Sequence, residues 1–143
     1  MKIRLVFALL IFCAACAHQA PQAKDTSASW SPDAAMQGLV DAWVVDLRGS
    51  PGDAPYTQPF VVSSVDLAQR RISGSFYGSD ISWSRVNTAW GKLVVTFMTS
   101  DGQGEYTHTA TVEGDSLVGT STARHRNMLV PWTARRAVNP RGK

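Results

Sequence analysis

Three histidines are the side chains best suited to metal binding or proton transfer in this 143-residue chain. His18, His108 and His125 lie far apart in the sequence, and no pair of them has the spacing of a zinc site. The segment at 101–105 offers two carboxylates in a glycine-rich loop, but it lacks the regular acidic spacing of a calcium loop. We therefore expect no metal and no cofactor, and we interpret 101–105 as a hairpin turn.

The sequence Gly-Asp-Ser-Leu at 114–117 resembles the motif that carries the nucleophile of the GDSL hydrolases. The resemblance implies a serine on a strand-to-helix turn, activated by a downstream Asp-x-x-His pair. Here no aspartate follows the motif, and His125 stands between two arginines without an acid to orient it. Glycine and aspartate are also common in tight turns. We expect no enzymatic activity, and a hydrolase that uses Ser116 stays a hypothesis for testing.

A histidine and a tyrosine fall on the more apolar face of the segment at 105–112. If that face points into a β domain, the two side chains provide polar groups for a ligand in an otherwise apolar pocket. The alternative is a histidine satisfied by hydrogen bonds in the core, with the aromatic residues as core packing. The residues that we expect to contact a ligand are Tyr106, His108, Phe97 and Trp83.

The elements that would position these side chains are short β-strands. From Gly38 onward polar and apolar residues alternate with a period of two, and Val, Thr, Ser, Tyr and Trp predominate. The expected strands cover residues 39–47, 60–66, 71–77, 81–86, 92–99, 105–112, 116–124 and 129–135. Gly74 and Gly119 fall in mid-strand, where sharply coiled barrel strands often need glycine. We predict an all-β domain over 38–137, a compact eight-stranded antiparallel meander barrel, with a β-sandwich as the alternative.

A tryptophan in the first strand and an arginine in the last resemble the lipocalins and the wider calycin barrels. The matching residues are Trp43 and Arg135, although this chain has Asp41 where the family carries the glycine of Gly-x-Trp. The resemblance implies that the arginine covers the tryptophan at the closed end of a barrel. It also implies that the other end opens to the interior.

The N-terminal residues predict export. Lys2 and Arg4 precede an unbroken apolar run at 5–12, and small residues follow, so we interpret 1–15 as a signal peptide. The sequence Cys-Ala-Ala-Cys at 13–16 resembles the lipobox of bacterial lipoproteins. This implies lipidation of Cys16 and, with alanine as the next residue, a place on the outer membrane facing the periplasm. Ordinary signal cleavage after Ala17 is the alternative.

The flanks of the domain are polar. Residues 16–37 are rich in Ala, Gln, Ser and Pro and predict a flexible tether after the lipidated cysteine, with Ser31 and Pro32 opening one short helical turn. Residues 138–143 form a basic tail. Without the signal peptide the chain keeps twelve of its fourteen basic residues and all eleven acidic ones, so its net charge is close to zero. We therefore expect no nucleic-acid partner.

Two functions fit these observations. The first is non-catalytic binding of a small apolar or amphipathic ligand in the barrel of an envelope lipoprotein. The alternative is a protein-interaction or enzyme-inhibitor module with a filled barrel, which docks an envelope protein through its loops. The short domain favours the alternative, because fewer residues leave less room for a cavity. The expected partners are therefore the membrane, through the lipid anchor, and either a small ligand or an envelope protein.

Overall fold

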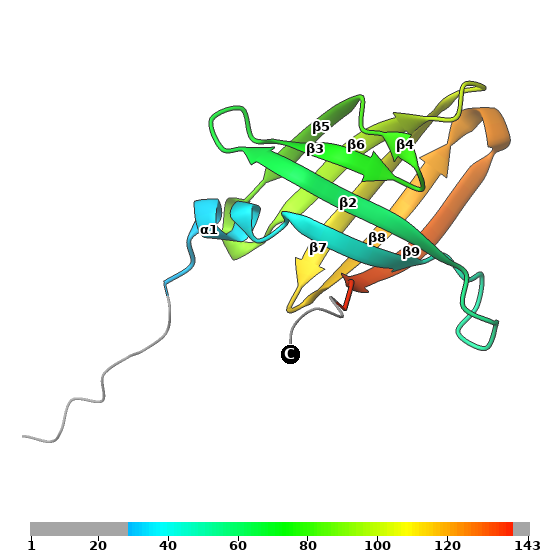
Figure 1. The fold of residues 1–143 in the computed structure, drawn as a ribbon, viewed down its shortest axis with the longest axis horizontal. Coiled ribbons are helices and arrows are strands. Elements are labelled where there is room, and N and C mark those ends of the chain that lie inside the picture. The colour runs from blue at the N-terminus through cyan, green and yellow to red at the C-terminus, as the bar shows by residue number, and fades with distance from the viewer. Residues whose placement is uncertain (1–28, 139–143) are drawn as a thin grey trace, which may run out of the picture.

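A computed structural model describes residues 29–138, which form one antiparallel sheet and one short helix (Figure 1). The helix is α1 (Pro32–Gln37), and two single turns are η1 (Ala89–Gly91) and η2 (Arg124–Arg126). The strands are β1 (Asp41–Asp46), β2 (Thr57–Asp66), β3 (Arg71–Phe76), β4 (Ser79–Asp80), β5 (Trp83–Asn87), β6 (Val94–Ser100), β7 (Glu105–Glu113), β8 (Ser116–Ala123) and β9 (Met128–Arg136). The all-β prediction is confirmed.

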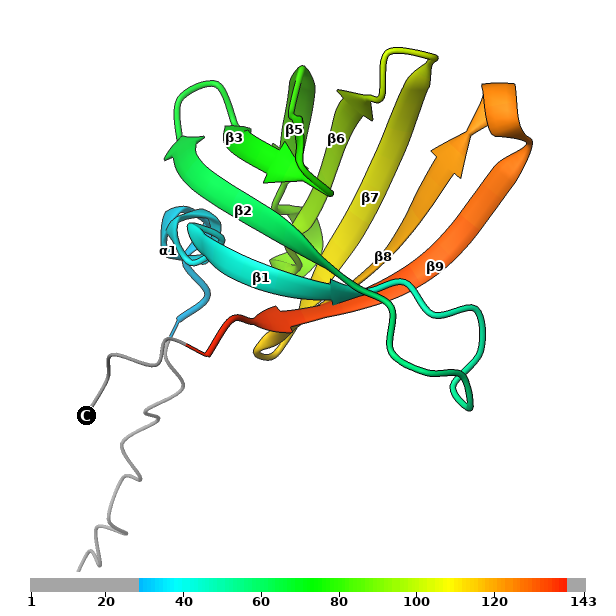
Figure 2. The same cartoon turned by 45° about the vertical axis from the view of Figure 1, so that its right-hand side comes forward.

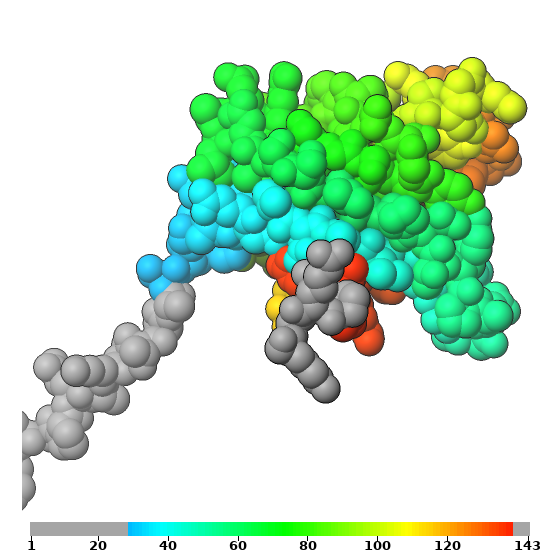
Figure 3. All heavy atoms as spheres, in the orientation of Figure 1, coloured from blue at the N-terminus to red at the C-terminus, as the bar shows by residue number. Residues whose placement is uncertain are grey.

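The sheet curls into a half-barrel (Figure 2). Its strand order is β4-β3-β2-β1-β9-β8-β7-β6-β5, so the first and last long strands, β1 and β9, pair with each other. All other neighbours follow one another along the chain. In the space-filling view, the segments from α1 to β3 form much of one face (Figure 3).

The curl brings β3 close to β5, although these strands share no ladder. The Ser84 hydroxyl takes the place of a backbone partner: it donates to the carbonyl of Ile72 at 2.7 Å and accepts from the N–H of Ile72 at 2.9 Å. The N–H of Val86 donates to the carbonyl of Arg70 at 2.9 Å. A buried serine thus satisfies backbone groups that an exposed sheet edge would leave open.

The described residues form nine strands rather than the eight expected. Tyr77 and Gly78 both have positive φ, at 54° and 82°, and turn the chain sharply. The two residues that follow pair with β3 as β4, whereas β5 begins at Trp83 and pairs with β6. The expected strand at 81–86 therefore begins two residues too early, because the sequence pattern does not show that Ile81 lies between two pairings.

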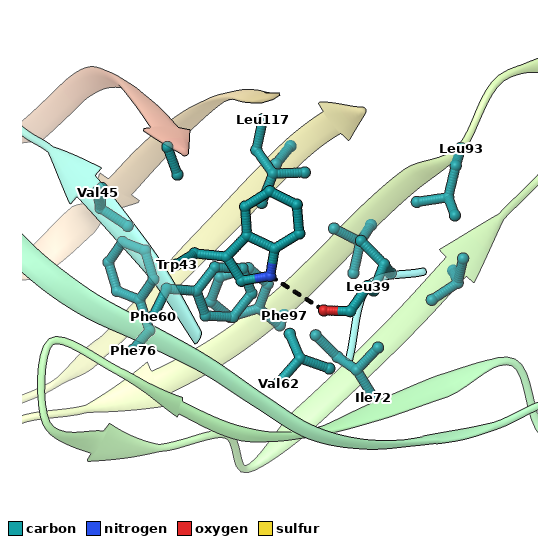
Figure 4. Close-up of a cluster of buried hydrophobic side chains, with 14 of the residues drawn as sticks. Leu39, Trp43, Val45, Phe60, Val62, Ile72, Phe76, Leu93, Phe97 and Leu117 are labelled. Carbon is teal, nitrogen blue, oxygen red and sulfur yellow. Dashed lines mark hydrogen bonds between the residues drawn. The ribbon is translucent and has the colours of Figure 1, made fainter. Parts of the chain in front are cut away.

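The core fills the concave face of the sheet. Phe60, Phe76 and Phe97 form its aromatic centre, with ring centroids 4.9–5.5 Å apart. Trp43 is 2 % exposed, and its indole N–H donates to the carbonyl of Leu39 at 3.0 Å (Figure 4). Each such large apolar side chain contributes roughly 1.5–3 kcal/mol when it is fully buried.

The expected short helical turn is present as α1. The Ser31 hydroxyl caps it by accepting from the N–H of Ala34 at 3.3 Å, and Pro32 occupies the first helical position. The helix lies in the range that we expected to be tether, yet its Met36 side chain is fully buried in the core. The packed part of the chain therefore includes residues before Gly38.

Candidate functional site

A pocket of about 420 Å³ opens at the end of the half-barrel opposite α1. It lies where β3, β6 and β8 end and where β7 and β9 begin. Apolar and aromatic side chains form its walls, and a few polar groups converge on it. The lining residues are Leu47, Tyr56, Phe76, Tyr77, Ser79, Thr99, Asp101, Tyr106, His108, Ser121, Arg126, Met128 and Val130.

A chain of hydrogen bonds forms the polar floor of this pocket. The His108 ring lies 3.0 Å through Nε2 from the Thr99 hydroxyl and 2.7 Å through Nδ1 from the Ser121 hydroxyl. The indole N–H of Trp132 donates to the same Ser121 oxygen at 2.9 Å. All four residues are at most 4 % exposed. Strand alternation places them on one face, since His108 stands opposite both Phe97 on β6 and Ser121 on β8.

Burial keeps His108 uncharged. Loss of hydration on burial disfavours the charged form and lowers the pKa of its imidazole to about 4. Two aromatic rings pack against it, Phe76 at 4.3 Å and Phe97 at 4.8 Å between centroids. The floor is therefore neutral at physiological pH.

The rim carries an ion pair and a tyrosine. Asp101 accepts from the Tyr106 hydroxyl at 2.8 Å and pairs with the Arg126 guanidinium at 2.5 Å. The Tyr106 hydrogen bond, a backbone N–H and Arg126 hold the pKa of Asp101 below its usual range. Across the opening, the hydroxyls of Tyr56 and Tyr77 form a hydrogen bond, which raises the pKa of Tyr77. The first set of contacts joins the β6–β7 hairpin to η2, and the second joins the segment before β2 to the turn after β3.

The four expected ligand residues separate into two groups. Tyr106 and His108 line the pocket together, with their rings nearly parallel and 6.4 Å apart. Phe97 is fully buried behind His108 and belongs to the core. Trp83 is 46 % exposed at the start of β5 and does not line the pocket.

Sequence reasoning missed Thr99 and Ser121. The alternation of residues along each strand could have predicted that both side chains point into the interior. Thr99 is in phase with Val95 and Phe97 along β6, and Ser121 is in phase with Leu117 along β8. A lone polar residue in phase with buried apolar ones indicates a polar group that the interior must satisfy.

Arg136, rather than the expected Arg135, covers Trp43. Its guanidinium lies 4.4 Å from the centre of the indole ring, and it donates to Asp41 and to the carbonyl of Gly38, both at 2.7 Å. Cross-strand register decides between the two arginines, because Trp43 stands opposite Arg136 in the β1–β9 pair. Arg135 stands opposite Val44, and side chains alternate between the faces of a strand.

The structure keeps the two residues of the hydrolase hypothesis apart. Ser116 begins β8, whereas His125 lies in η2 beyond the other end of that strand. Within residues 29–138, no group of three or more His, Cys, Asp or Glu side chains could hold a metal ion.

Several sequence predictions lie outside the described residues. These are the signal peptide at 1–15, Cys16, the first part of the tether and the basic tail from residue 139. In the part of the chain that the structure describes, no helix has the length and apolar character needed to cross a membrane.

Comparison with protein-family models, curated proteins and solved structures finds no match to this chain.

Proposed function

We propose that this protein is an envelope lipoprotein whose β domain binds a small apolar or amphipathic molecule without catalysis. The observation that carries the proposal is the pocket of about 420 Å³ at the open end of the half-barrel. Ligand sites are typically concave, mostly apolar and roughly 300–1,000 Å³ in volume, with a few placed polar groups. The walls offered by Phe76, Met128 and Val130 above the His108 floor match that description.

We also propose that the domain is a calycin-like barrel. The support comes from the end opposite the pocket, where Arg136 stacks on Trp43 and α1 lies beside the same residues. Contacts between β3 and β5 through Ser84 and Val86 narrow the gap in the sheet. One end of such a barrel is closed by packed side chains, and the other is left for a ligand.

Filling the pocket should abolish ligand binding. Val130 is half-buried and lines the pocket, so Val130→Trp places an indole in the space that a ligand would occupy. Native mass spectrometry of the purified wild-type protein, after exposure to an envelope lipid extract, is expected to show an added mass that organic extraction removes. The added mass should disappear in Val130→Trp.

Val118→Trp is the matched control for that experiment. Val118 lies on β8 and is 42 % exposed on the outer face of the sheet, so the same enlargement should leave the added mass in place. A wild-type protein that stays free of any added mass would contradict ligand binding. So would an added mass that both tryptophan variants retain.

The proposed anchor has a separate test. Cys16→Ser removes the thiol that would receive the lipid, and the variant is expected to move from the membrane fraction to the soluble fraction of the envelope. The domain is not altered, so its thermal unfolding should be unchanged. A variant that stays in the membrane fraction would show that Cys16 is not the anchor. The proposed location is the outer membrane, with the domain facing the periplasm.

One observation favours the alternative of a protein-interaction module. The Trp90 side chain is 98 % exposed in η1, at the opposite end of the half-barrel from the pocket, and its backbone has φ of 60°. Exposed tryptophans are frequent anchors of protein interfaces. If the protein takes up no ligand, the interaction of this surface with an envelope protein becomes the leading proposal.

A further inference from the structure

The floor of the pocket carries more hydrogen-bond donors than its own acceptors use. Four polar hydrogens belong to the network at pH 7, one each from the Trp132 indole, the Ser121 hydroxyl, the neutral His108 ring and the Thr99 hydroxyl. The network contains three contacts: Trp132 to Ser121, Ser121 to His108, and His108 to Thr99. Each contact uses one hydrogen, so one hydrogen is left over.

The tautomer of His108 decides which residue holds that hydrogen. If Nε2 is protonated, Ser121 donates to Nδ1 and the ring donates to Thr99, which leaves the Thr99 hydrogen unused. If Nδ1 is protonated, Thr99 donates to Nε2 and the Ser121 hydrogen is unused. In the second case Ser121 would accept from both Trp132 and His108, and its own hydrogen would have no acceptor among the described residues, just as the Thr99 hydrogen has none in the first case. The short 2.7 Å contact to Nδ1 is the natural place for the Ser121 hydrogen.

Thr99 therefore has a hydroxyl hydrogen free to face the pocket that it lines. Its oxygen is engaged by the His108 ring, and among residues 29–138 its side chain has no other hydrogen-bond partner. The residue is 4 % exposed, so this donor lies at the bottom of the pocket rather than in open solvent. A buried donor without an acceptor is unfavourable, and an acceptor on a ligand would satisfy it.

We propose that the pocket selects an otherwise apolar molecule with an uncharged hydrogen-bond acceptor, such as a carbonyl oxygen, and that Thr99 donates to it. This inference rests on the proposed function, because it assigns the ligand class of the same site. The walls combine aliphatic side chains with aromatic rings, notably Phe76 and Tyr106, which suit a flat apolar ring system.

The charge distribution favours a neutral acceptor over a carboxylate at this position. His108 is uncharged at physiological pH, and no basic side chain belongs to the floor network. Arg126, the arginine that lines the pocket, lies at the rim and is paired there with Asp101. An anion at the floor would lose its hydration without a compensating charge.

The test uses two probes of the same shape, methyl naphthyl ketone and isopropenylnaphthalene, in which a methylene group replaces the carbonyl oxygen. Wild-type protein is expected to bind the ketone about ten-fold more tightly, the value of one net hydrogen bond. In Thr99→Val the ketone should bind about ten-fold more weakly while the hydrocarbon is unaffected. Thr99→Ser retains the hydroxyl and should keep the preference for the ketone.

Thr120→Val is the matched control, because Thr120 lies on the exposed outer face of β8. Nitrogen chemical shifts of His108 give an independent readout, and the Nε2–H tautomer is expected. Equal binding of both probes to wild type, or an Nδ1–H tautomer, would overturn the role of Thr99 and leave ligand binding intact. Failure of both probes to bind would count against the proposed function as well as this inference.

Discussion

Gly74→Ala is expected to destabilise the domain by at least about 3 kcal/mol, the upper range for a side chain forced into a packed interior. The φ of Gly74 is 150°, and a Cβ atom added there would overlap the carbonyl oxygen of Val61 and lie 2.9 Å from its carbon. Both atoms belong to the backbone of β2, so no rotation of a side chain can relieve the overlap. Thermal unfolding should show a melting temperature lower by roughly 10 °C or more.

A bulge in β2 lies beside this close approach. The register between β2 and β3 shifts between Val62 and Ser64, next to the Val62–Gly74 pair, and we attribute the approach to the bend that a bulge introduces into its strand. Gly52→Ala is the matched control, since a Cβ at that loop position meets nothing within 4 Å. A Gly74→Ala protein as stable as the Gly52→Ala protein would contradict this account of the curl.

The sequence predicts the elements that depend on local patterns. The period-two alternation locates the strands, and Gly74 and Gly119 are recognised because a glycine in mid-strand has no local advantage. Gly119 also has a structural reason for its place, as a Cβ there would lie 2.5 Å from the Trp132 ring. Ser31 and Pro32 likewise signal α1 through capping chemistry alone.

Local sequence patterns do not predict the features that depend on pairing between strands distant in the sequence. The choice of Arg136 over Arg135 follows from the register of β1 with β9, which the residues of β9 do not encode by themselves. The hydrogen-bond network in the floor of the pocket also depends on the register between paired strands. His108 is visible in the sequence as a polar residue on an apolar face, but its partners Thr99 and Ser121 come from two neighbouring strands. Only the paired sheet places the three side chains in one network.

The buried histidine should make the stability of the protein fall in mildly acidic solution. The pKa of His108 is about 4 in the folded protein against an ordinary value of 6.5, so the unfolded chain takes up the proton first as the pH falls. Stability is therefore full above about pH 6.5 and is lost progressively down to about pH 4, by on the order of 3 kcal/mol. Urea unfolding at several pH values across this window measures the loss.

Two ion-paired aspartates act in a lower pH range. The guanidinium of Arg48 lowers the pKa of Asp46 to about 2 from 3.8, so this ion pair stabilises the fold above about pH 4 and is lost as the pH falls through about 2. The pKa of Asp101 at the rim is also lowered, so its contribution too is lost only below 3.8. A loss of stability that is already complete near pH 4 therefore cannot come from these carboxylates.

The variant His108→Gln separates the histidine from every other source of pH dependence. Glutamine can still hydrogen-bond to Thr99 and Ser121 but does not titrate, so the slope of stability between about pH 6.5 and 4 should disappear, whatever the absolute stability of the variant. His125→Gln, in the exposed turn η2, should retain the wild-type slope. If His108→Gln kept that slope, the imidazole would not be buried in its neutral form. A charged ring donates from both nitrogens, so the hydroxyl hydrogens of Thr99 and Ser121 would both be free, and the floor would carry a positive charge that favours an anionic ligand over a neutral acceptor.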